Sequence, residues 1–234
     1  MPSARYLGVN IRALIESDEH CVQTLQLNGF TNIVRADIRE VDFTQYKGTD
    51  ILTGGLPCQP FSISGRDSGA QDPRNLWAEA VRAIEEMQPR MFLFEMVRGF
   101  LRPKFRSTVK RVLAAIRAQG YQVKVYQVNA ADYGVPQNRK RCLLIGHLKP
   151  GRLRCPPRID APVTVASVLD ALGPPNGVNR HTEQGSAREY EHHRPSKLSA
   201  PAKTVRAGTN GPGGGCNTVR LANGASQWTR RGCR

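Results

Sequence analysis

The sequence has few acidic residues, no closely paired cysteines and no long apolar run. Each of these absences argues against a class of protein. Its 19 Asp and Glu face 34 Lys and Arg, so the formal charge of +15 favours a polyanion such as nucleic acid as the partner. No apolar run is long enough to span a membrane, and residues 1–5 do not lead into a signal-peptide core. The six cysteines are scattered without a CxxC pair, which argues against a disulfide framework or a bound metal and for a reducing cytoplasm.

Short apolar runs alternate with helical periodicity from residue 9 to about residue 148, and this alternation predicts an α/β fold. We expect a Rossmann-like, mostly parallel sheet flanked by helices, in a first domain over residues 1–150. Strands are expected at residues 9–16, 33–36, 51–53, 91–94, 121–128 and 142–145, and helices at residues 18–27, from Asp72-Pro73 to Met87, and along Val109, Val112, Leu113 and Ile116 before Gly120.

Residues 151–234 differ in composition from the first domain, with 13 Lys or Arg against five acids and many Pro, Gly and Ser. A short helix is expected around Val165 to Leu172, and short strands at Thr204-Val205 and at residues 218–221. Asn223-Gly224 is a hairpin-turn signal. These features favour a small, irregular basic lobe over the alternative, a disordered basic tail.

Four polar side chains fall at the ends of predicted strands: Glu16, Asp37, Cys58 and Glu95. In parallel sheets ligands gather at the carboxyl ends of the strands, so these positions predict one shared site. Glu16 lies at the end of a predicted strand and before a predicted helix. An acid at such a position is typical of a site that binds ribose hydroxyls. A surface acid with no partner is the alternative for Glu16 and more so for Asp37.

Cys58 stands in the stiff run Gly54-Gly55-Leu56-Pro57-Cys58-Gln59-Pro60-Phe61-Ser62, which would display a nucleophile, although most free cysteines are small core residues. Glu95 follows four apolar residues, a place that suits a proton donor or a structural acid. Arg139 and Arg141 occupy alternate positions at the start of a strand. Their guanidinium groups suit phosphate or carbonyl oxygens, and a solvated charge run is the alternative.

These motifs, in this order, resemble those of the cytosine-5 DNA methyltransferase family over residues 9–150. Pro57-Cys58-Gln59 resembles the family's nucleophile motif, Glu95-Met96-Val97 its Glu-Asn-Val motif, and Gln137-x-Arg139-x-Arg141 its Gln-x-Arg-x-Arg motif. Residues 72–76 resemble the helix start that follows the nucleophile loop. Residues 201–205 resemble, with lower specificity, part of the family's target-recognition lobe.

The resemblance implies an S-adenosylmethionine-dependent methyltransferase fold and methyl transfer to C5 of cytosine in DNA, as in restriction-modification systems. Cys58 would attack C6 of a flipped-out cytosine, Glu95 would hold and protonate N3, and Arg141, supported by Arg139, would contact the base oxygen. Further contacts are implied to the cofactor from Glu16, Asp37, Ile38, Pro57 and Leu76, and to DNA from Gln59, Ser62, Gln137 and Thr204. The implied protein is a monomer in a bacterial-type cytoplasm or nucleoid, with DNA as partner and residues 151–234 as the recognition lobe.

The sequence departs from the family pattern in three places. No glycine-rich strand-turn stands before Val9, residues 228–234 do not match the family's C-terminal motifs, and Met96 replaces an asparagine. We therefore expect a fragment truncated at both ends that binds S-adenosylmethionine poorly, and inactivity of the isolated chain stays open. Two alternatives stay open: a cytosine-5 methyltransferase acting on tRNA, and a non-catalytic DNA-binding remnant.

Overall fold

The computed structural model describes residues 8–56, 76–148, 151, 155–170, 199–203, 219–220 and 227–228. The chain forms two compact units. The first comprises Met1–Tyr126 and Leu143–Gly151, and the second comprises Gln127–Cys142 and Arg152–Arg234. The segment that carries Gln137, Arg139 and Arg141 therefore belongs to the second unit.

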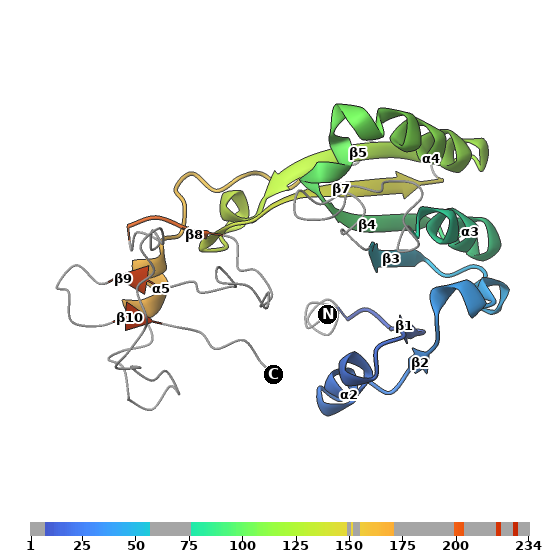
Figure 1. Ribbon diagram of the computed structural model, residues 1–234, viewed down its shortest axis with the longest axis horizontal. Helices are drawn as coiled ribbons and strands as arrows, with labels where there is room; N and C mark the ends of the chain where they lie inside the picture. The colour runs from blue at the N-terminus through green and yellow to red at the C-terminus, as the bar shows by residue number, and fades with distance from the viewer. Residues whose placement is uncertain are drawn as a thin grey trace. The chain divides into compact units, whose positions relative to one another are not determined.

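A four-stranded sheet has the strand order β3-β4-β7-β5 (Figure 1). Its strands are β3 (Ile51–Gly55), β4 (Met91–Val97), β5 (Gln122–Asn129) and β7 (Lys140–His147). β3 and β4 are parallel, whereas the arrows in Figure 1 show β7 running opposite to β4 and β5. The four strands predicted at residues 51–53, 91–94, 121–128 and 142–145 lie in this sheet, which mixes parallel and antiparallel neighbours where a mostly parallel sheet was expected.

A separate parallel pair is formed by β1 (Leu14–Glu16) and β2 (Ile33–Arg35), which are joined by α2 (Glu19–Leu27). The expected helix at 18–27 is confirmed, because Asp18 caps its start through the Cys21 N–H and Asn28 caps its end. Gly29, at φ +74°, adopts the left-handed conformation that ends the helix without strain.

The prediction of a strand from residue 9 is wrong in extent, because the strand begins only at Leu14. Its partner β2 offers just three residues for pairing. Upstream of the strand, the Asn32 side chain donates to the Ile11 carbonyl at 2.7 Å, and Arg12 reaches across to the segment before β3. Side-chain contacts thus replace the ladder that the apolar pattern predicted.

Two amphipathic helices accompany the sheet, α3 (Trp77–Met87) and α4 (Arg106–Ala118) (Figure 1). Both predicted apolar stripes lie inward: Ala80, Ile84 and Met87 of α3 and Val112 and Ile116 of α4 are buried, and Leu76, Val81, Val109 and Leu113 are half-buried. The part of α3 expected from Asp72 lies outside the described residues.

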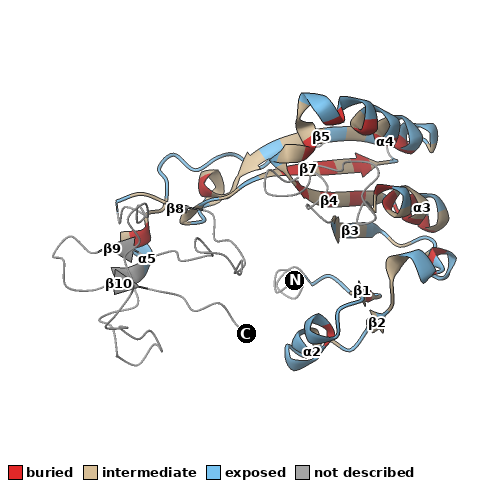
Figure 2. Cartoon of the chain, viewed as in Figure 1, coloured by how far each residue is buried: buried red, intermediate tan, exposed pale blue. Residues whose placement is uncertain are grey.

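Aromatic side chains dominate the core between β4 and α3 (red in Figure 2). The Trp77 ring stacks on Phe100 with centroids 4.7 Å apart and meets the edge of Phe94 at 6.3 Å. Phe92 contacts Phe94 at 5.1 Å and Tyr121 at 5.5 Å. Such pairs add to the free energy of apolar burial and fix the position of β4.

A smaller core cluster lies where the segment between β2 and β3 packs on α3. It contains Val41, Phe43, Ala83 and Met87, with Ile15, Ala36, Ile38, Tyr46 and Leu52 partly buried against it. The intervening segment has two 3₁₀ turns, η1 (Ile38–Glu40) and η2 (Phe43–Tyr46). This cluster brings β1 and the start of β3 to the same helix.

The structure of β4 differs from what the sequence predicted. Glu95 was expected to follow the strand, but it lies inside β4, where it pairs with Gly55 of β3, and β4 continues two residues further to Val97. Coverage of both faces was also expected. Instead Phe92, Phe94 and Met96 are buried, whereas Met91, Leu93, Glu95 and Val97 on the other face are half-buried. The Glu95 side chain thus occupies the less covered face.

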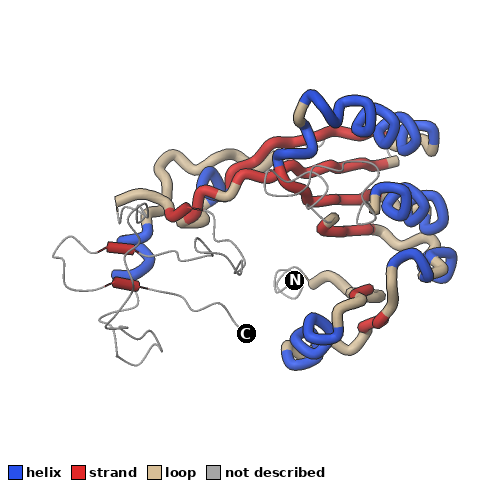
Figure 3. Tube along the Cα trace, viewed as in Figure 1, coloured by secondary structure: helices blue, strands red, loops and turns tan. Residues whose placement is uncertain are grey.

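The described residues of the second unit include several short elements (Figure 3). They are η7 (Ala130–Tyr133), β6 (Gln137–Asn138), α5 (Val165–Asp170), β8 (Ala202–Lys203), β9 (Val219–Arg220) and β10 (Gln227–Trp228). β6 pairs in parallel with β8, and β9 pairs antiparallel with β10, as the predicted hairpin requires. Thr204-Val205 and the turn residues Asn223-Gly224 lie outside the described residues.

Candidate active site and cofactor site

Glu95 lies directly beside the end of β3. In the register of the two strands Glu95 pairs with Gly55, and the Leu56 N–H donates to the Glu95 carbonyl at 3.3 Å. A Cβ added to Gly55 would stand 3.9 Å from Glu95 Oε2, so the carboxylate lies alongside this glycine. The chain leaves β3 here toward Cys58, three residues beyond Gly55. Glu95 therefore lies at the strand end from which the predicted nucleophile segment departs.

Glu95 is held on a rigid support. Its strand neighbours Phe94 and Met96 are buried at 3% and 4% exposure. Gly54 packs so closely on Phe94 that an added Cβ would stand 3.2 Å from the ring. A carboxyl group on such a strand keeps a fixed position, as a group that serves as proton donor or hydrogen-bond acceptor must.

Glu16 and Asp37 lie at the same edge of the β1–β2 pair, where the carboxyl ends of the two strands are. Glu16 pairs with Arg35 at the ends of the two strands, and the Ala36 N–H donates to the Glu16 carbonyl at 3.2 Å. Glu16 Oε1 accepts hydrogen bonds from the backbone N–H groups of Ser17 and Asp18 at 2.8 and 3.0 Å. These bonds fix the carboxylate at the strand end, where the sequence predicted a site.

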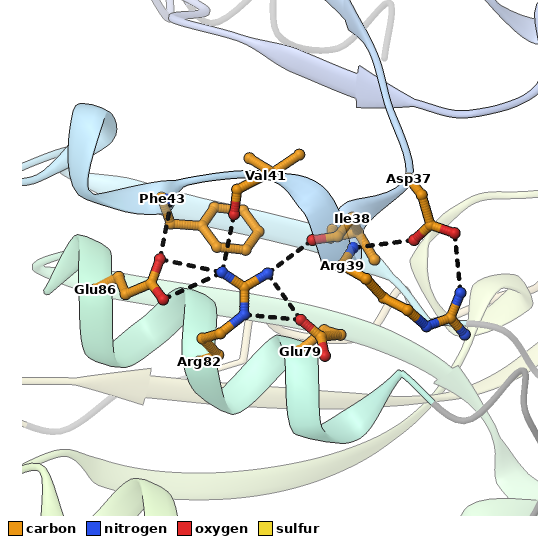
Figure 4. Close-up of polar contacts among 8 residues, drawn as sticks. All are labelled: Asp37, Ile38, Arg39, Val41, Phe43, Glu79, Arg82 and Glu86. Carbon is orange, nitrogen blue, oxygen red and sulfur yellow. Dashed lines mark hydrogen bonds and ion pairs between the residues drawn. The ribbon is translucent and has the colours of Figure 1, made fainter.

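Asp37 caps the η1 turn that follows β2. Its Oδ1 accepts the Arg39 N–H at 3.0 Å, and its Oδ2 pairs with Arg39 Nη1 at 2.9 Å (Figure 4). The backbone hydrogen bond from Arg39, helped by the charge of its guanidinium, lowers the pKa of Asp37 against the opposing effect of desolvation. The side chain is therefore an ionised acceptor at neutral pH.

Gln137, Arg139 and Arg141 are described within the second unit. Gln137 pairs with Ala202 in the β6–β8 ladder, and the Arg139 carbonyl accepts the Ala130 N–H at 3.0 Å. All three residues are half-buried, and Arg141 Nη1 donates to the Lys140 carbonyl at 2.9 Å. The predicted convergence of Cys58, Glu95 and Arg141 on one cytosine stays a prediction.

Several predicted site residues lie outside the described residues: Pro57, Cys58, Gln59, Ser62 and Thr204. Leu76, expected at the cofactor, is half-buried immediately before α3, and its carbonyl accepts the Ala80 N–H. Within the described ranges, every helix is too short or too polar to cross a bilayer. The same ranges hold no group of three or more His, Cys, Asp or Glu arranged to bind a metal ion.

Three charged residues near the candidate cofactor site were missed by sequence reasoning. Glu79, Arg82 and Glu86 of α3 form ion pairs, with Arg82 reaching Glu79 at 2.8 Å and Glu86 at 3.1 Å. The guanidinium also donates to the carbonyls of Ile38 and Val41 (Figure 4). The spacing of three and four residues indicates helical ion pairs, so the sequence held a signal for the pairs but none for the carbonyls.

Comparison with known proteins gives the family. Residues 3–202 match the model of the C-5 cytosine-specific DNA methylases. The type II methyltransferase M.NgoMIV of Neisseria gonorrhoeae is 40% identical over 139 residues, 59% of this chain and 45% of that protein. M.NlaX of Neisseria lactamica is 35% identical over 158 residues, 67% of this chain and 50% of that protein.

A solved structure from E. coli, described as a DNA modification methyltransferase encoded within a prophage, shares the fold at a TM-score of 0.57 and 27% identity. The match covers 69% of this chain and 48% of that one. The chain spans about 30% to 50% of the length of the curated relatives it matches. The family model covers most of the 234 residues, including every described element from β1 to α5. The chain therefore belongs to the C-5 cytosine-specific DNA methylase family.

Proposed function

We propose that this protein transfers a methyl group to C5 of cytosine in DNA, with S-adenosylmethionine as the methyl donor, as part of a restriction-modification system. Residues 1–150 form the catalytic part and residues 151–234 the basic lobe that grips phosphates and reads flanking bases. The named relatives are type II methyltransferases, which supports this assignment. DNA is the partner that the charge of +15 suits.

The reaction begins with Cys58. Its thiolate adds to C6 of a flipped-out cytosine and so makes C5 nucleophilic. Glu95 holds N3 and protonates it, so that negative charge does not build up on the ring. Arg141, supported by Arg139, contacts the base oxygen. After methylation, loss of the C5 proton and of the thiolate restores the aromatic base.

The donor set at the β1–β2 edge fits S-adenosylmethionine chemically. The Glu16 and Asp37 carboxylates are acceptors suited to ribose hydroxyls and to an adenine amino group. Ile38, which follows Asp37 and is partly buried against the cluster of Val41, Phe43, Ala83 and Met87, is proposed as an apolar contact to the adenine. Pro57 and Leu76 complete the proposed contacts. When bound, this cofactor supplies the electrophilic methyl group that C5 takes.

One observation carries the proposal: the register that sets Glu95 against Gly55, at the end of the strand that leads into Pro57-Cys58-Gln59. A covalent mechanism on cytosine needs a thiolate and a carboxylic acid on the same base at once. Neighbouring parallel strands that end together bring two such groups to one edge of a sheet. Gln59, Ser62, Gln137 and Thr204 are proposed to contact the DNA around that base.

The test is covalent trapping on DNA that contains 5-fluorocytosine, at S-adenosylmethionine concentrations high enough to offset the poor binding expected of this chain. Fluorine at C5 cannot leave as a proton would, so a chain that completes thiolate addition and methylation stays attached to the DNA. We expect a slowly migrating adduct on a denaturing gel. C58A abolishes it, and E95Q lowers its rate by a factor of about 100 or more.

C155A is the matched control, because it removes an exposed thiol that the mechanism does not use. Adduct formation by C58A would contradict the role of Cys58. Wild-type protein that binds DNA without trapping would favour the non-catalytic remnant. Trapping on 5-fluorocytosine tRNA in preference to DNA would favour the tRNA enzyme.

A further inference from the structure

The guanidinium of Arg82 lies between α3 and the segment that joins β2 to β3 (Figure 4). Its Nη2 donates to the Ile38 carbonyl at 2.8 Å and its Nη1 to the Val41 carbonyl at 2.8 Å. On the helix side, Nε and Nη2 each lie 2.8 Å from Glu79 Oε2, and Nη1 lies 3.1 Å from Glu86 Oε1. One side chain therefore joins two carboxylates of its own helix to two carbonyls more than 40 residues away.

This arrangement needs an arginine. The guanidinium has five N–H donors in one plane, and its three nitrogens together contact Glu79, Glu86, Ile38 and Val41, with Nη1 shared between the Val41 carbonyl and both oxygens of Glu86. A lysine has three donors on one atom and cannot reach both carbonyls and both carboxylates. Burial alone lowers the pKa of Arg82, but the hydrogen bonds to Glu79 and Glu86 outweigh it and raise the pKa overall.

Two further contacts fasten the same segment to α3. Glu86 Oε2 accepts the backbone N–H of Phe43 at 3.0 Å, and the Arg82 guanidinium lies 4.8 Å from the centre of the Phe43 ring. Phe43 itself is 1% exposed in the cluster with Ala83 and Met87. The segment from Ile38 to Phe43 is thus held at both of its 3₁₀ turns by α3.

The contacts of Asp37 cannot hold it in this way. Its carboxylate accepts hydrogen bonds from the backbone N–H and from Nη1 of Arg39, two residues along the chain, and this ion pair is about half exposed. A local pair moves together with its segment. Arg82 is different, because it ties the residue after Asp37 to a helix that packs on the main sheet.

We propose that Arg82 is a positioning residue for the cofactor: by holding the Ile38 and Val41 carbonyls it sets the place of Asp37 and Ile38 against the adenine. This inference rests on the proposed function, since it takes Asp37 and Ile38 as the adenine contacts. Arg82 itself touches no cofactor atom in this scheme. Its loss therefore weakens cofactor binding without affecting DNA binding.

The experiment compares wild type with R82K, well below the unfolding temperature of either. Binding of S-adenosylhomocysteine is followed by NMR titration, binding of a 30-base-pair DNA by fluorescence anisotropy, and amide hydrogen exchange by mass spectrometry. We expect R82K to bind S-adenosylhomocysteine at least about tenfold more weakly, to exchange faster over residues 38–43, and to bind DNA as wild type does. A merely structural role would lower both affinities together.

R90K is the matched control, because Arg90 pairs with Asp50 on the surface and makes no side-chain contact to residues 38–43 that the structure records. E79Q is the second variant. It keeps the carbonyl contacts of Arg82 and loses only one carboxylate charge, so we expect a smaller loss of affinity than for R82K. E79Q also tests the inference if R82K does not fold.

The outcomes separate the inference from the proposed function. Equal affinity of wild type, R82K and E79Q for S-adenosylhomocysteine overturns the role of Arg82 and leaves the proposed function standing. Parallel losses of cofactor and DNA affinity also overturn it. If the wild type does not bind S-adenosylhomocysteine at all, the cofactor assignment in the proposed function fails, and the role of Arg82 fails with it even where the exchange pattern changes.

Discussion

The four-stranded sheet and the β1–β2 region of the first unit are attached to α3 by different means. Behind the sheet, Trp77, Phe92, Phe94 and Phe100 are at most 3% exposed and pack ring against ring. In the β1–β2 region, residues 8–49, Phe43 is the one fully buried large side chain among those described. There the smaller cluster of Val41, Phe43, Ala83 and Met87 is supplemented by arginine contacts to backbone carbonyls. Arg82 reaches them from α3, and Arg12 ties the segment before β1 to residues 45–49 of the same region.

This difference divides the proposed functions between two kinds of support. Glu95, the proposed proton donor, stands on the aromatic sheet, whereas Glu16, Asp37 and Ile38, the proposed cofactor contacts, stand in the arginine-held region. Packed aromatic cores resist small changes of shape, because any added volume meets a neighbour. Polar contacts near the surface are individually weaker and respond to salt and charge. Cofactor binding is therefore the property most easily altered by surface substitutions.

The largest expected effect comes from overfilling the aromatic side. Gly146 of β7 faces Phe92 of β4, and an added Cβ would overlap the Phe92 ring. We expect G146A to lower the free energy of unfolding by about 3 kcal/mol, as overpacking in a rigid core does. Urea unfolding measures it. G151A is the control, because a Cβ on Gly151 meets nothing within 4 Å. Equal stability of the two variants would mean that the sheet core accommodates the added methyl group and is not rigid at Phe92.

The second effect is on alkaline stability. The Tyr121 hydroxyl donates to the Pro89 carbonyl at 2.6 Å, and burial raises the pKa of Tyr121 from 10.0 to about 12. The folded state keeps its proton to higher pH than the unfolded state, so this stability is complete below pH 10 and is lost as pH rises toward 12. The loss is on the order of 2 kcal/mol.

Denaturant unfolding at pH 9, 10 and 11 tests this difference. Y121F has no phenol to titrate, so we expect it to lose less stability over this range than wild type. At pH 9 we expect Y121F to be less stable than wild type, because it lacks the hydrogen bond to the Pro89 carbonyl. Y126F leaves Tyr121 in place and should follow the wild-type curve. Parallel curves for wild type and Y121F would contradict a role for Tyr121 in the alkaline decline.

The third effect concerns the arginine-held side. Arg12 Nη1 donates to Thr49 Oγ1 at 2.9 Å, and Nη2 donates to the Gln45 carbonyl at 3.3 Å. We expect R12Q to cost about 1 kcal/mol, because the contacts are charge-assisted but exposed. R35Q, which breaks only the exposed Arg35–Glu19 pair, is the control and should cost less than about 0.5 kcal/mol. Thermal unfolding measures both variants. Similar losses of stability in R12Q and R35Q would mean that hydrogen bonds to backbone carbonyls stabilise the protein no more than an exposed ion pair does.

The same two regions differ in how far the sequence predicted them. Strands and helices of the sheet region follow apolar periodicity, because burial on one face is what periodicity reports. Glu95 was assigned to the right strand end but outside the strand, since the length of β4 depends on pairing with neighbouring strands that the local apolar pattern does not report. Arg82 was missed because its carbonyl partners, Ile38 and Val41, lie 44 and 41 residues away, and backbone carbonyls carry no sequence signal. The predicted extension of β1 over Arg12 is wrong for the same reason, because Arg12 contacts the Gln45 carbonyl and Thr49, which lie far along the chain.

The smallest expected effect lies on the solvent face of α4, where neither kind of support operates. The first turn of α4 has no acidic residue and no side-chain cap, and Ser107 in it is exposed. S107E places a carboxylate near the positive end of the helix dipole and four residues before Arg111, which should stabilise the protein by about 0.5 kcal/mol. S107Q isolates the charge, because it matches the size of the new side chain. Thermal unfolding in low salt should separate the two variants, and 0.5 M NaCl should bring them together by screening. A gain that S107Q shares, or one that survives salt, would indicate helix propensity rather than charge as its cause.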